Sequence, residues 1–349
     1  MRSRGPESDK VVPSMGVFGQ GYATVAADLG HDSGKIIDQL SGRRILVTGA
    51  TGFIGGHVAE LLHHIGAEIH AVTRRVDSTT SYDTPVQWHH ADLTDHGATV
   101  DAVAEAQPDV IVHLASLVKG SRDPEQLVPM FAANTASAVH LLDAARANGV
   151  QRVLLAGSLE EPDEPGQMAA SPYALSKAAA HLYGDYYQAT TGVEVVNLQI
   201  FMVYGPAQLD ENKLIPYVIR SLQAGRAPSL SSGSRKVDWV YVGDVAEGIA
   251  RCCAVGDPPE YAVPLGTGSL ATVRDVVEML VEVSGSDLEP EFGGVADRAR
   301  EVEKVADADT THDMLGWVPK VTLTEGLSAT LEWYGGVPLR NATNSQGDT

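Results

Sequence analysis

The chain has 349 residues, enough for two domains or for one large domain that carries a lobe. Its hydrophobic content of 44% and aromatic content of 6% are typical of a globular protein with a substantial core. Because 45 acidic and 25 basic side chains leave a formal net charge of −20, the surface repels phosphate backbones and anionic lipid. Nucleic acid and membranes are therefore excluded as expected partners.

Short apolar runs alternate with longer amphipathic stretches between residues 44 and 203. Residues 1–40 precede this pattern as an N-terminal extension that we expect to be partly mobile, with one short helix around Ile36–Leu40. Strands separated by helices of this length predict an α/β fold with a doubly wound parallel sheet. The predicted strands are Arg44–Thr48, Glu68–Thr73, Val86–His90, Val110–Leu114, Arg152–Ala156 and Glu194–Val203, and the predicted helices are His57–Ile65, Thr99–Ala106, Val128–Asn148 and Tyr173–Thr190.

The alternation ends after Gly205-Pro206, which predicts a smaller C-terminal lobe as the substrate-binding part. We expect the sheet domain to comprise residues 41–205 and about 237–260, where a strand and a helix return to the sheet. The lobe is then built from residues 206–236 and 261–335, and residues 336–349 form a polar tail.

A glycine-rich motif follows the first predicted strand and opens the first helix of the sheet domain. Glycines at this spacing let the backbone turn tightly and approach a pyrophosphate, and the helix N-terminus offers free N–H groups to that anion. Strand, motif and helix occur in the required order, so the sheet domain is predicted to be a Rossmann domain that binds NAD(P). The residues expected to hold the dinucleotide here are Gly49, Thr51, Gly52, Phe53, Ile54 and Gly55.

The end of the second strand indicates which dinucleotide is bound. NAD-binding domains place a carboxylate there for the ribose 2′-hydroxyl, whereas NADP-binding domains place arginine for the 2′-phosphate. This chain has Arg74 and Arg75 and no acid before Asp77, so NADP(H) is favoured and NAD(H) is the alternative. Asp92 ends the next strand, where it could contact the adenine edge or cap the helix that follows.

Tyr173 and Lys177 are four residues apart on a predicted helix, which places both on one face. A nearby ammonium stabilises the tyrosine phenolate and makes the hydroxyl useful in proton transfer. Ser158 follows the strand Arg152–Ala156 at the carboxyl edge of the sheet, where such folds bind ligands. Its hydroxyl can hold a substrate oxygen while Tyr173 transfers the proton, so Ser158, Tyr173 and Lys177 are the predicted catalytic set.

Taken together, these motifs resemble the extended short-chain dehydrogenase/reductase family, in its NAD-dependent epimerase/dehydratase branch that acts on nucleotide sugars. The resemblance covers all but about the first 40 residues and the tail. The matching segments are Val47–Gly55, His113–Ala115, Asn134, Ser158, Tyr173–Lys177, Phe201–Pro206, Trp239–Val245, Ala306-Asp307 and Leu315–Pro319.

This resemblance implies further site residues, a nucleotide-diphosphate sugar as substrate, and a homodimer through a four-helix interface that includes the Tyr173 helix. Tyr173 and Lys177 also contact the cofactor in such enzymes. The other implied cofactor contacts are Leu93, Leu114, Ala115, Ser116, Asn134, Ile200 and Val203. The implied substrate contacts, besides Ser158 and Glu160, are Lys119, Met202, Lys213, Leu214, Pro216, Arg235 and Arg298.

Several positions depart from the family pattern and weaken the assignment of a particular substrate. Gln199 and Met202 replace the usual Arg and Asn before Tyr-Gly-Pro, Val237 replaces an Arg, and Gly243 replaces an acid. Glu161 and the following proline replace the usual aromatic-Gly pair after the catalytic serine.

The leading functional hypothesis is an NADP(H)-dependent reductase of a nucleotide-activated 4-keto-6-deoxy sugar, with thymidine, guanosine or cytidine diphosphate as the carrier. The alternative is a nucleotide-sugar epimerase, dehydratase or decarboxylase that keeps its NAD(P) bound, in which Glu160 would serve as a second base. A remote alternative is a non-catalytic NADP-sensing protein, which would have no need of Ser158, Tyr173 and Lys177.

The expected location is the cytoplasm. The first residues lack the hydrophobic core of a signal peptide, and no apolar run reaches the ~18–20 residues that span a bilayer. Cys252 and Cys253 are sequence neighbours that cannot form an ordinary disulfide, which favours a reducing compartment. The histidine pairs at 63–64 and 89–90 lack a third ligand at a metal-like spacing, so no metal site is expected.

Overall fold

The computed structural model describes residues 34–74, 84–163, 166–257, 259, 261–297 and 302–336. The N-terminal extension up to residue 33, Arg75, Arg298 and the tail from residue 337 onward lie outside these ranges.

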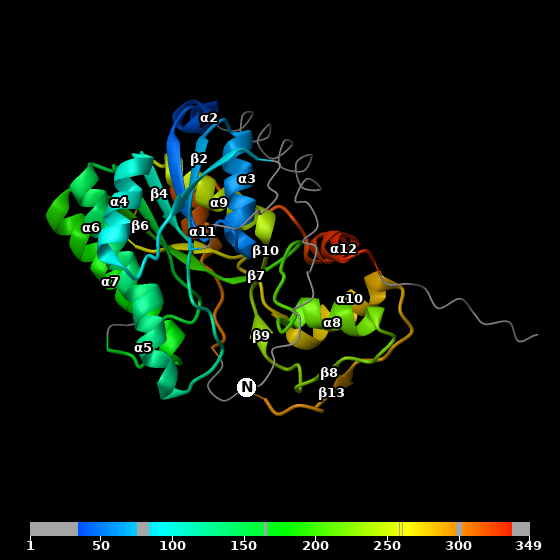
Figure 1. Cartoon of the computed structure of the whole chain (residues 1–349). Coiled ribbons are helices and arrows are strands. Elements are labelled where there is room, and N and C mark those ends of the chain that lie inside the picture. Colours follow the sequence, from blue (N-terminus) through cyan, green and yellow to red (C-terminus); the bar gives the residue numbers. More distant parts are fainter. Residues whose placement is uncertain are drawn as a thin grey trace, which may run out of the picture.

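A seven-stranded parallel sheet forms the centre of the molecule (Figure 1). Its strand order is β11-β6-β5-β4-β1-β2-β3, so the chain starts in the middle and winds outward in both directions. The reversal lies between β1 and β4, and ligands bind in such folds beyond the carboxyl ends of the strands at this point. The strands are β1 Arg44–Thr48, β2 Glu68–Thr73, β3 Val86–His90, β4 Val110–His113, β5 Arg152–Ala156, β6 Glu194–Ile200 and β11 Val263–Leu265.

Two hydrophobic cores, one on each face of the sheet, confirm the predicted doubly wound α/β fold. The helices that connect parallel strands cover both faces of the sheet. Their apolar side chains therefore pack against it on each side. One core is formed with α2 (Gly34–Leu40), α3 (Phe53–His64) and α9 (Val242–Ala254). The other is formed with α4 (His96–Ala106), α6 (Ser137–Asn148) and α7 (Pro172–Thr191).

The long helix expected at Val128–Asn148 consists of three segments. These are α5 (Leu127–Met130), a π-helical turn η3 (Phe131–Ala136) and α6. A π turn inserts an extra residue into the helical ladder and is frequent at functional sites. It contains Asn134, whose side chain is described with the active site below.

The segment after residue 236 was expected to return to the main sheet, but its strands do not join that sheet. The segment forms β9 (Lys236–Val237) and β10 (Trp239–Tyr241), which pair with short strands outside the main sheet. The strand that joins the sheet instead is β11, which pairs with β6 although the sequence analysis placed it in the lobe. β6 itself stops at Ile200, and β7 (Met202–Tyr204) turns away to pair with β10.

The C-terminal lobe lies beside the sheet domain (Figure 1) and has a third hydrophobic core of its own. Its elements are α8 (Leu214–Gln223), α10 (Val273–Ser284), α12 (Leu323–Trp333), β8 (Ser229–Leu230), β12 (Ala271–Thr272) and β13 (Glu291–Phe292). The helix α11 (Ala308–Leu315) packs back against β11 and α9.

Asp238, which is fully buried, joins this lobe to the sheet domain. Its carboxylate accepts hydrogen bonds from the backbone N–H groups of Thr267 (2.7 Å), Gly268 (3.0 Å) and Ala306 (3.0 Å). Three backbone donors on one buried carboxylate fix the path of two chain segments at once.

Cys252 and Cys253 are buried free thiols in α9. No helix within the described ranges is long and apolar enough to cross a membrane.

Candidate active site

The glycine-rich turn between β1 and α3 has no room for side chains at its key positions. Gly49 has a left-handed φ of +72°, and a Cβ there would lie 2.7 Å from the backbone nitrogen of Ala115. A Cβ on Gly55 would lie 2.2 Å from the carbonyl oxygen of Gly49. Gly52 caps α3 without any side-chain hydrogen bond to the first N–H groups of the helix. The turn therefore offers its backbone to an anion, and its residues fit a dinucleotide pyrophosphate.

A buried chain of hydrogen bonds supports this turn from below. Thr48 Oγ1 lies 2.7 Å from His113 Nδ1 and accepts a hydrogen bond from the N–H of Ala115 at 3.2 Å. Burial, and secondarily the charge of Lys177, lowers the pKa of His113 to about 3. The imidazole is therefore neutral, and one hydrogen bond joins its Nδ1 to the Thr48 hydroxyl. This arrangement fixes the ends of β1 and β4 beside the glycine turn.

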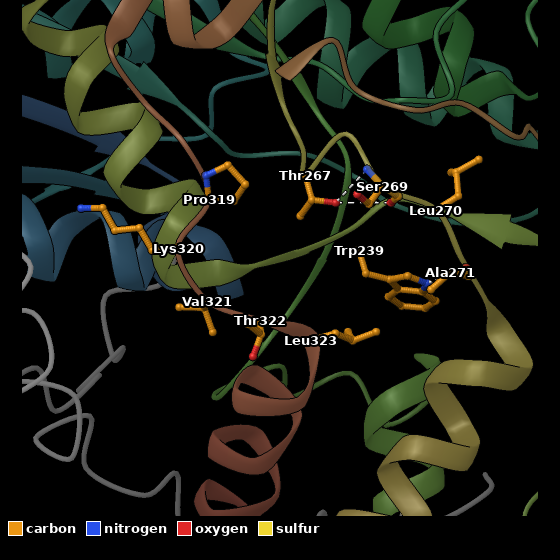
Figure 2. A pocket seen from close by; sticks show the side chains of 10 residues that line it. All are labelled: Trp239, Thr267, Ser269, Leu270, Ala271, Pro319, Lys320, Val321, Thr322 and Leu323. Carbon is orange, nitrogen blue, oxygen red and sulfur yellow. Dashed lines mark hydrogen bonds between the residues drawn. The ribbon is translucent and has the colours of Figure 1, made fainter. Parts of the chain in front are cut away.

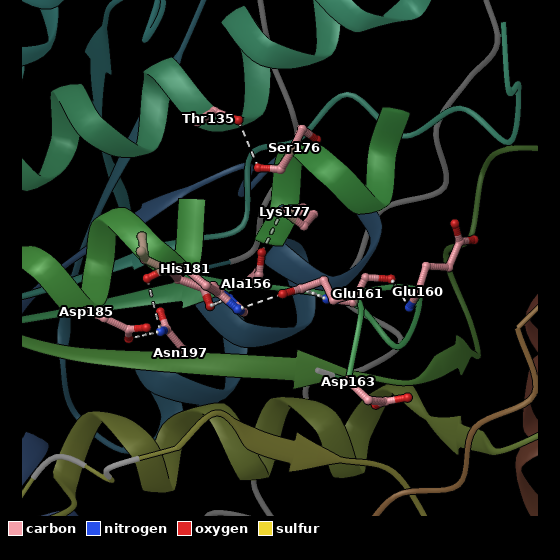
Figure 3. Close-up of polar contacts among 12 residues, drawn as sticks. Thr135, Ala156, Glu160, Glu161, Asp163, Ser176, Lys177, His181, Asp185 and Asn197 are labelled. Carbon is pink, nitrogen blue, oxygen red and sulfur yellow. Dashed lines mark hydrogen bonds and ion pairs between the residues drawn. The ribbon is translucent and has the colours of Figure 1, made fainter. Parts of the chain in front are cut away.

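The face of α7 that carries the predicted catalytic residues lies against the end of β5 (Figure 3). Ser171 caps this helix by accepting a hydrogen bond from the N–H of Ala174. Lys177, buried on the next turn, donates from Nζ to the carbonyl oxygen of Ala156 at 2.7 Å. Burial lowers the pKa of Lys177 to about 8, while the Glu161 carboxylate opposes this shift.

The three predicted catalytic residues meet at this edge of the sheet. The side chains of Ser158 and Ser116 lie close to the hydroxyl of Tyr173 and favour its ionised form. Burial raises the pKa of Tyr173 well above its usual range, and the carboxylates of Glu160 and Glu161 raise it further. Tyr173 therefore keeps its proton at neutral pH, and the arrangement can deliver that proton to an oxygen held beside Ser158.

Asn134 has all of its amide's hydrogen-bonding groups satisfied by the chain itself. Its Oδ1 accepts from the N–H of Leu117 (2.7 Å) and from Ser116 Oγ (3.1 Å). Its Nδ2 donates to the carbonyl oxygen of Leu117 (3.1 Å) and to Ser176 Oγ (2.9 Å). The side chain thus ties the loop after β4 to α7 and sets the position of Ser116 against Tyr173. Its contact with a cofactor stays a prediction.

The other predicted cofactor contacts are distributed around the same edge of the sheet. Arg74 is exposed at the end of β2, and Asp92 is held by the N–H and hydroxyl of Thr94, with its pKa lowered mainly by these hydrogen bonds. Asp92 is not the cap of α4, because Asp95 fills that position. Leu93 and Ile200 are buried in the cores, and Leu114 and Val203 are half-buried.

The predicted substrate contacts are divided between the loop after β4 and the lobe. Lys119 is exposed in that loop, and Lys213 precedes α8 as an exposed N-cap residue. Met202 and Leu214 are half-buried, and Pro216 is buried. Arg235 is half-buried and donates to the carbonyl oxygen of Val302 at 3.1 Å. Their contacts with a substrate stay predictions.

Three residues beside Ser158 were not singled out as site residues by the sequence analysis. Glu161 and His181 are both buried and lie 2.8 Å apart, and Lys304 donates to the backbone oxygen of Glu161 at 2.8 Å. Lys304 is 143 positions away from Glu161. The one available signal was that Glu161, three residues after the catalytic serine, departs from the family pattern.

A separate cavity of about 270 Å³ is lined by Trp239 of β10, by the segment 267–271 and by the segment 319–323 (Figure 2). Trp239, Leu270 and Leu323 give it apolar walls, and Thr267 and Ser269 lie on one side. None of the predicted catalytic, cofactor-binding or substrate-binding residues lines it.

The family model described as the NAD dependent epimerase/dehydratase family matches residues 45–263. The chain belongs to this family. It is an NAD(P)-dependent enzyme of the extended short-chain dehydrogenase type, as its motifs predicted.

Characterised relatives of the family align with most of the chain. A UDP-glucose 4-epimerase of Mycolicibacterium smegmatis is 29% identical over 320 residues, which cover 83% of this chain and 98% of the relative. A dTDP-glucose 4,6-dehydratase of Streptomyces griseus is 31% identical over 313 residues, covering 83% and 93%. The UDP-glucose 4-epimerase of Thermus thermophilus, solved with NAD, is similar in structure with a TM-score of 0.75 at 28% identity, covering 84% and 99%.

The glycine turn leads to a first prediction. Gly42 and Gly49 share a φ of +72°, but a Cβ on Gly42 would meet nothing within 4 Å. Gly42→Ala should therefore cost only the backbone strain of about 1–2 kcal/mol. Gly49→Ala adds a collision with the backbone at Leu114 and Ala115, so it should be less stable and bind the dinucleotide at least tenfold more weakly. Thermal unfolding and fluorescence titration with NADH and NADPH measure both effects. Equal losses in the two variants would contradict this role of the turn.

Proposed function

We propose that the protein is an NADP(H)-dependent reductase that acts on the C4 ketone of a nucleotide-activated 4-keto-6-deoxy sugar. The observation that carries the proposal is the state of Tyr173. Burial and two nearby carboxylates raise its pKa, which favours the protonated phenol from which ketone reduction starts. A reductase needs an acid at this position in its first step. An epimerase or a dehydratase begins by oxidising the sugar and needs a base there.

The side chains divide the work of ketone reduction as follows. Ser158 holds the ketone oxygen, and the hydroxyl of Tyr173 gives that oxygen its proton. Lys177 is positively charged below a pH of about 8 and stabilises the phenolate left behind. The bound dinucleotide supplies the hydride to the ketone carbon.

The carboxylates beside Tyr173 favour a reductase over a dehydratase. A dehydratase must also remove a proton from the carbon next to the transient ketone, which requires a second base. Glu160 is a candidate, but its Oε2 already accepts a hydrogen bond from Ser171 Oγ at 3.0 Å. Glu161 is engaged by Ser158 and His181, and the residue directly after Ser158 is the buried Leu159 rather than an acid. Glu160 Oε2 and both oxygens of Glu161 thus already have partners within the described chain, which makes these carboxylates weaker bases for that step.

The second candidate is a nucleotide-sugar epimerase or dehydratase with tightly bound NAD. The names of the relatives favour it, because they are UDP-glucose 4-epimerases and dTDP-glucose 4,6-dehydratases. Such an enzyme would release product without net consumption of NADPH, which distinguishes it from the reductase.

The second prediction concerns the proton donor. With NADPH and a 4-keto-6-deoxy nucleotide sugar, the wild-type protein should oxidise one NADPH per product. Tyr173→Phe keeps the ring and removes the acid, so turnover should fall by about 10²–10⁴ while cofactor binding survives. Tyr261→Phe serves as the control, because Tyr261 is 70% exposed and far along the chain from Ser158 and Tyr173. Near-normal turnover in Tyr173→Phe would mean that another group supplies the proton.

The third prediction concerns the choice of cofactor. Arg74 follows β2 directly, and the described chain has no carboxylate at this strand end to receive a ribose 2′-hydroxyl. Arg74→Ala combined with Arg75→Ala should weaken NADPH by roughly 1.5–3 kcal/mol per lost charge-assisted bond and leave NADH nearly unchanged. The wild type and the double variant are each titrated with NADPH and with NADH, and the NADH affinity serves as the internal control. Equal wild-type affinities for NADH and NADPH would rule out the NADP preference.

We also propose a homodimer through α5, η3 and α7, which pack side by side. Large apolar side chains are exposed on this surface, which is unusual for a surface that faces only water. They are Leu127, Val128, Phe131, Leu175, Leu182, Tyr183 and Tyr186.

The fourth prediction tests this surface with a single charge. The wild-type protein should be a dimer and Leu182→Asp a monomer, because an unpaired charge is costly in an apolar interface. Leu209→Asp is the matched control, since Leu209 is also exposed but lies outside α5, η3 and α7. A monomeric wild-type protein in light scattering would contradict the proposed homodimer.

A further inference from the structure

The carboxylate of Glu161 is buried and points toward His181 instead of facing solvent (Figure 3). Its Oε1 accepts a hydrogen bond from the backbone N–H of Ser158 at 2.5 Å. Its backbone N–H donates to the carbonyl oxygen of Ser158 at 3.1 Å. The turn from Ser158 to Glu161 is therefore closed by both the backbone and the side chain of Glu161, and the buried carboxylate acts directly on the residue that holds the substrate oxygen.

The second oxygen of this carboxylate contacts His181. Glu161 Oε2 lies 2.8 Å from His181 Nδ1, and both side chains are buried. The other ring nitrogen, Nε2, lies 3.3 Å from the carbonyl oxygen of Leu155. A carbonyl oxygen only accepts, so Nε2 must carry a hydrogen. The contact between Nδ1 and Oε2 then needs a second proton, since two lone pairs at 2.8 Å would repel each other.

His181 follows Tyr173 and Lys177 at the next helical repeat, so the three side chains lie on one face of α7. Space around the pair is limited, because a Cβ on Gly157 would lie 2.2 Å from His181 Cε1 and 2.3 Å from Glu161 Oε1. Glu161 and His181 thus connect the loop that carries Ser158 to the helix that carries Tyr173.

We propose that Glu161 and His181 form a buried, proton-sharing pair of positioning residues that holds Ser158 in register with Tyr173. The contacts of the ring place one proton between Glu161 Oε2 and His181 Nδ1 and a second on Nε2, which faces the carbonyl oxygen of Leu155. This deepens the proposed function of the same site, and only the kinetic part of its test rests on that function.

The other charged groups near the pair are held elsewhere. Lys177 Nζ donates to the carbonyl oxygen of Ala156, and Glu160 accepts from Ser171. Lys304 pairs with Asp163 at 2.6 Å and contacts Glu161 only through its backbone oxygen. In the described structure, His181 is therefore the side chain that contacts Oε2 of the Glu161 carboxylate.

The kinetic test compares two replacements of Glu161. In Glu161→Gln the amide oxygen can still accept from the N–H of Ser158, and the amide nitrogen can donate to a neutral His181. This variant should keep kcat within about threefold of wild type. Glu161→Leu removes both contacts, and misplacing Ser158 should lower kcat about 10²-fold with KM much less changed. Asp163→Asn, an exposed carboxylate on the same loop, is the control that should leave kcat unchanged.

The spectroscopic test needs no substrate and separates the pair from the reaction. Two-bond ¹H–¹⁵N spectra report which ring nitrogens of His181 carry protons. At pH 7 we expect protons on both nitrogens in the wild type and on Nε2 alone in Glu161→Gln. An unchanged ring between these proteins, or a Glu161→Leu variant with wild-type kcat, would overturn the proposal. Absence of NADPH oxidation in every protein would instead contradict the proposed reductase. The spectra of His181 would then still test the proposed pair.

Discussion

The geometry of the site depends on the contact between one face of α7 and the last carbonyl groups of β5. Lys177 reaches the carbonyl oxygen of Ala156, and His181 on the next turn reaches that of Leu155. β5 in turn lies between β4 and β6 in the interior of the sheet. The position of Tyr173 is thus fixed relative to the sheet rather than to a mobile loop, as the transfer of a proton over hydrogen-bond distance requires.

Burial at this contact has opposite effects on the two catalytic ionisable groups, because it disfavours whichever form is charged. It raises the pKa of Tyr173 and lowers that of Lys177 to about 8. At neutral pH the pair is therefore a neutral phenol beside an ammonium, which suits the protonation of a ketone. Because the chain is strongly negative, the phosphates of the dinucleotide depend on the free backbone N–H groups at the N-terminus of α3.

The parts that the sequence predicted well are local ones. The glycine turn, the Tyr173–Lys177 spacing and six of the sheet strands depend on neighbours within a few residues. β11 was not predicted because it has three residues with a proline at its centre, a weak strand signal. The π turn that carries Asn134 lies within a continuous helical pattern. Glu161 and His181 are 20 positions apart and meet only once α7 has packed against β5, and no local pattern encodes that contact.

The central claim is that hydride leaves the bound cofactor and stays on the sugar, with Tyr173 supplying the proton. Incubation of the wild-type protein with NADPH deuterated at the transferred position and a 4-keto-6-deoxy nucleotide sugar tests it most directly. The account predicts one deuterium at C4 of the product and one equivalent of oxidised cofactor, detected by NMR and mass spectrometry. An unlabelled product formed without cofactor oxidation, or exchange of solvent hydrogen at C5, would contradict the account and favour an epimerase or a dehydratase.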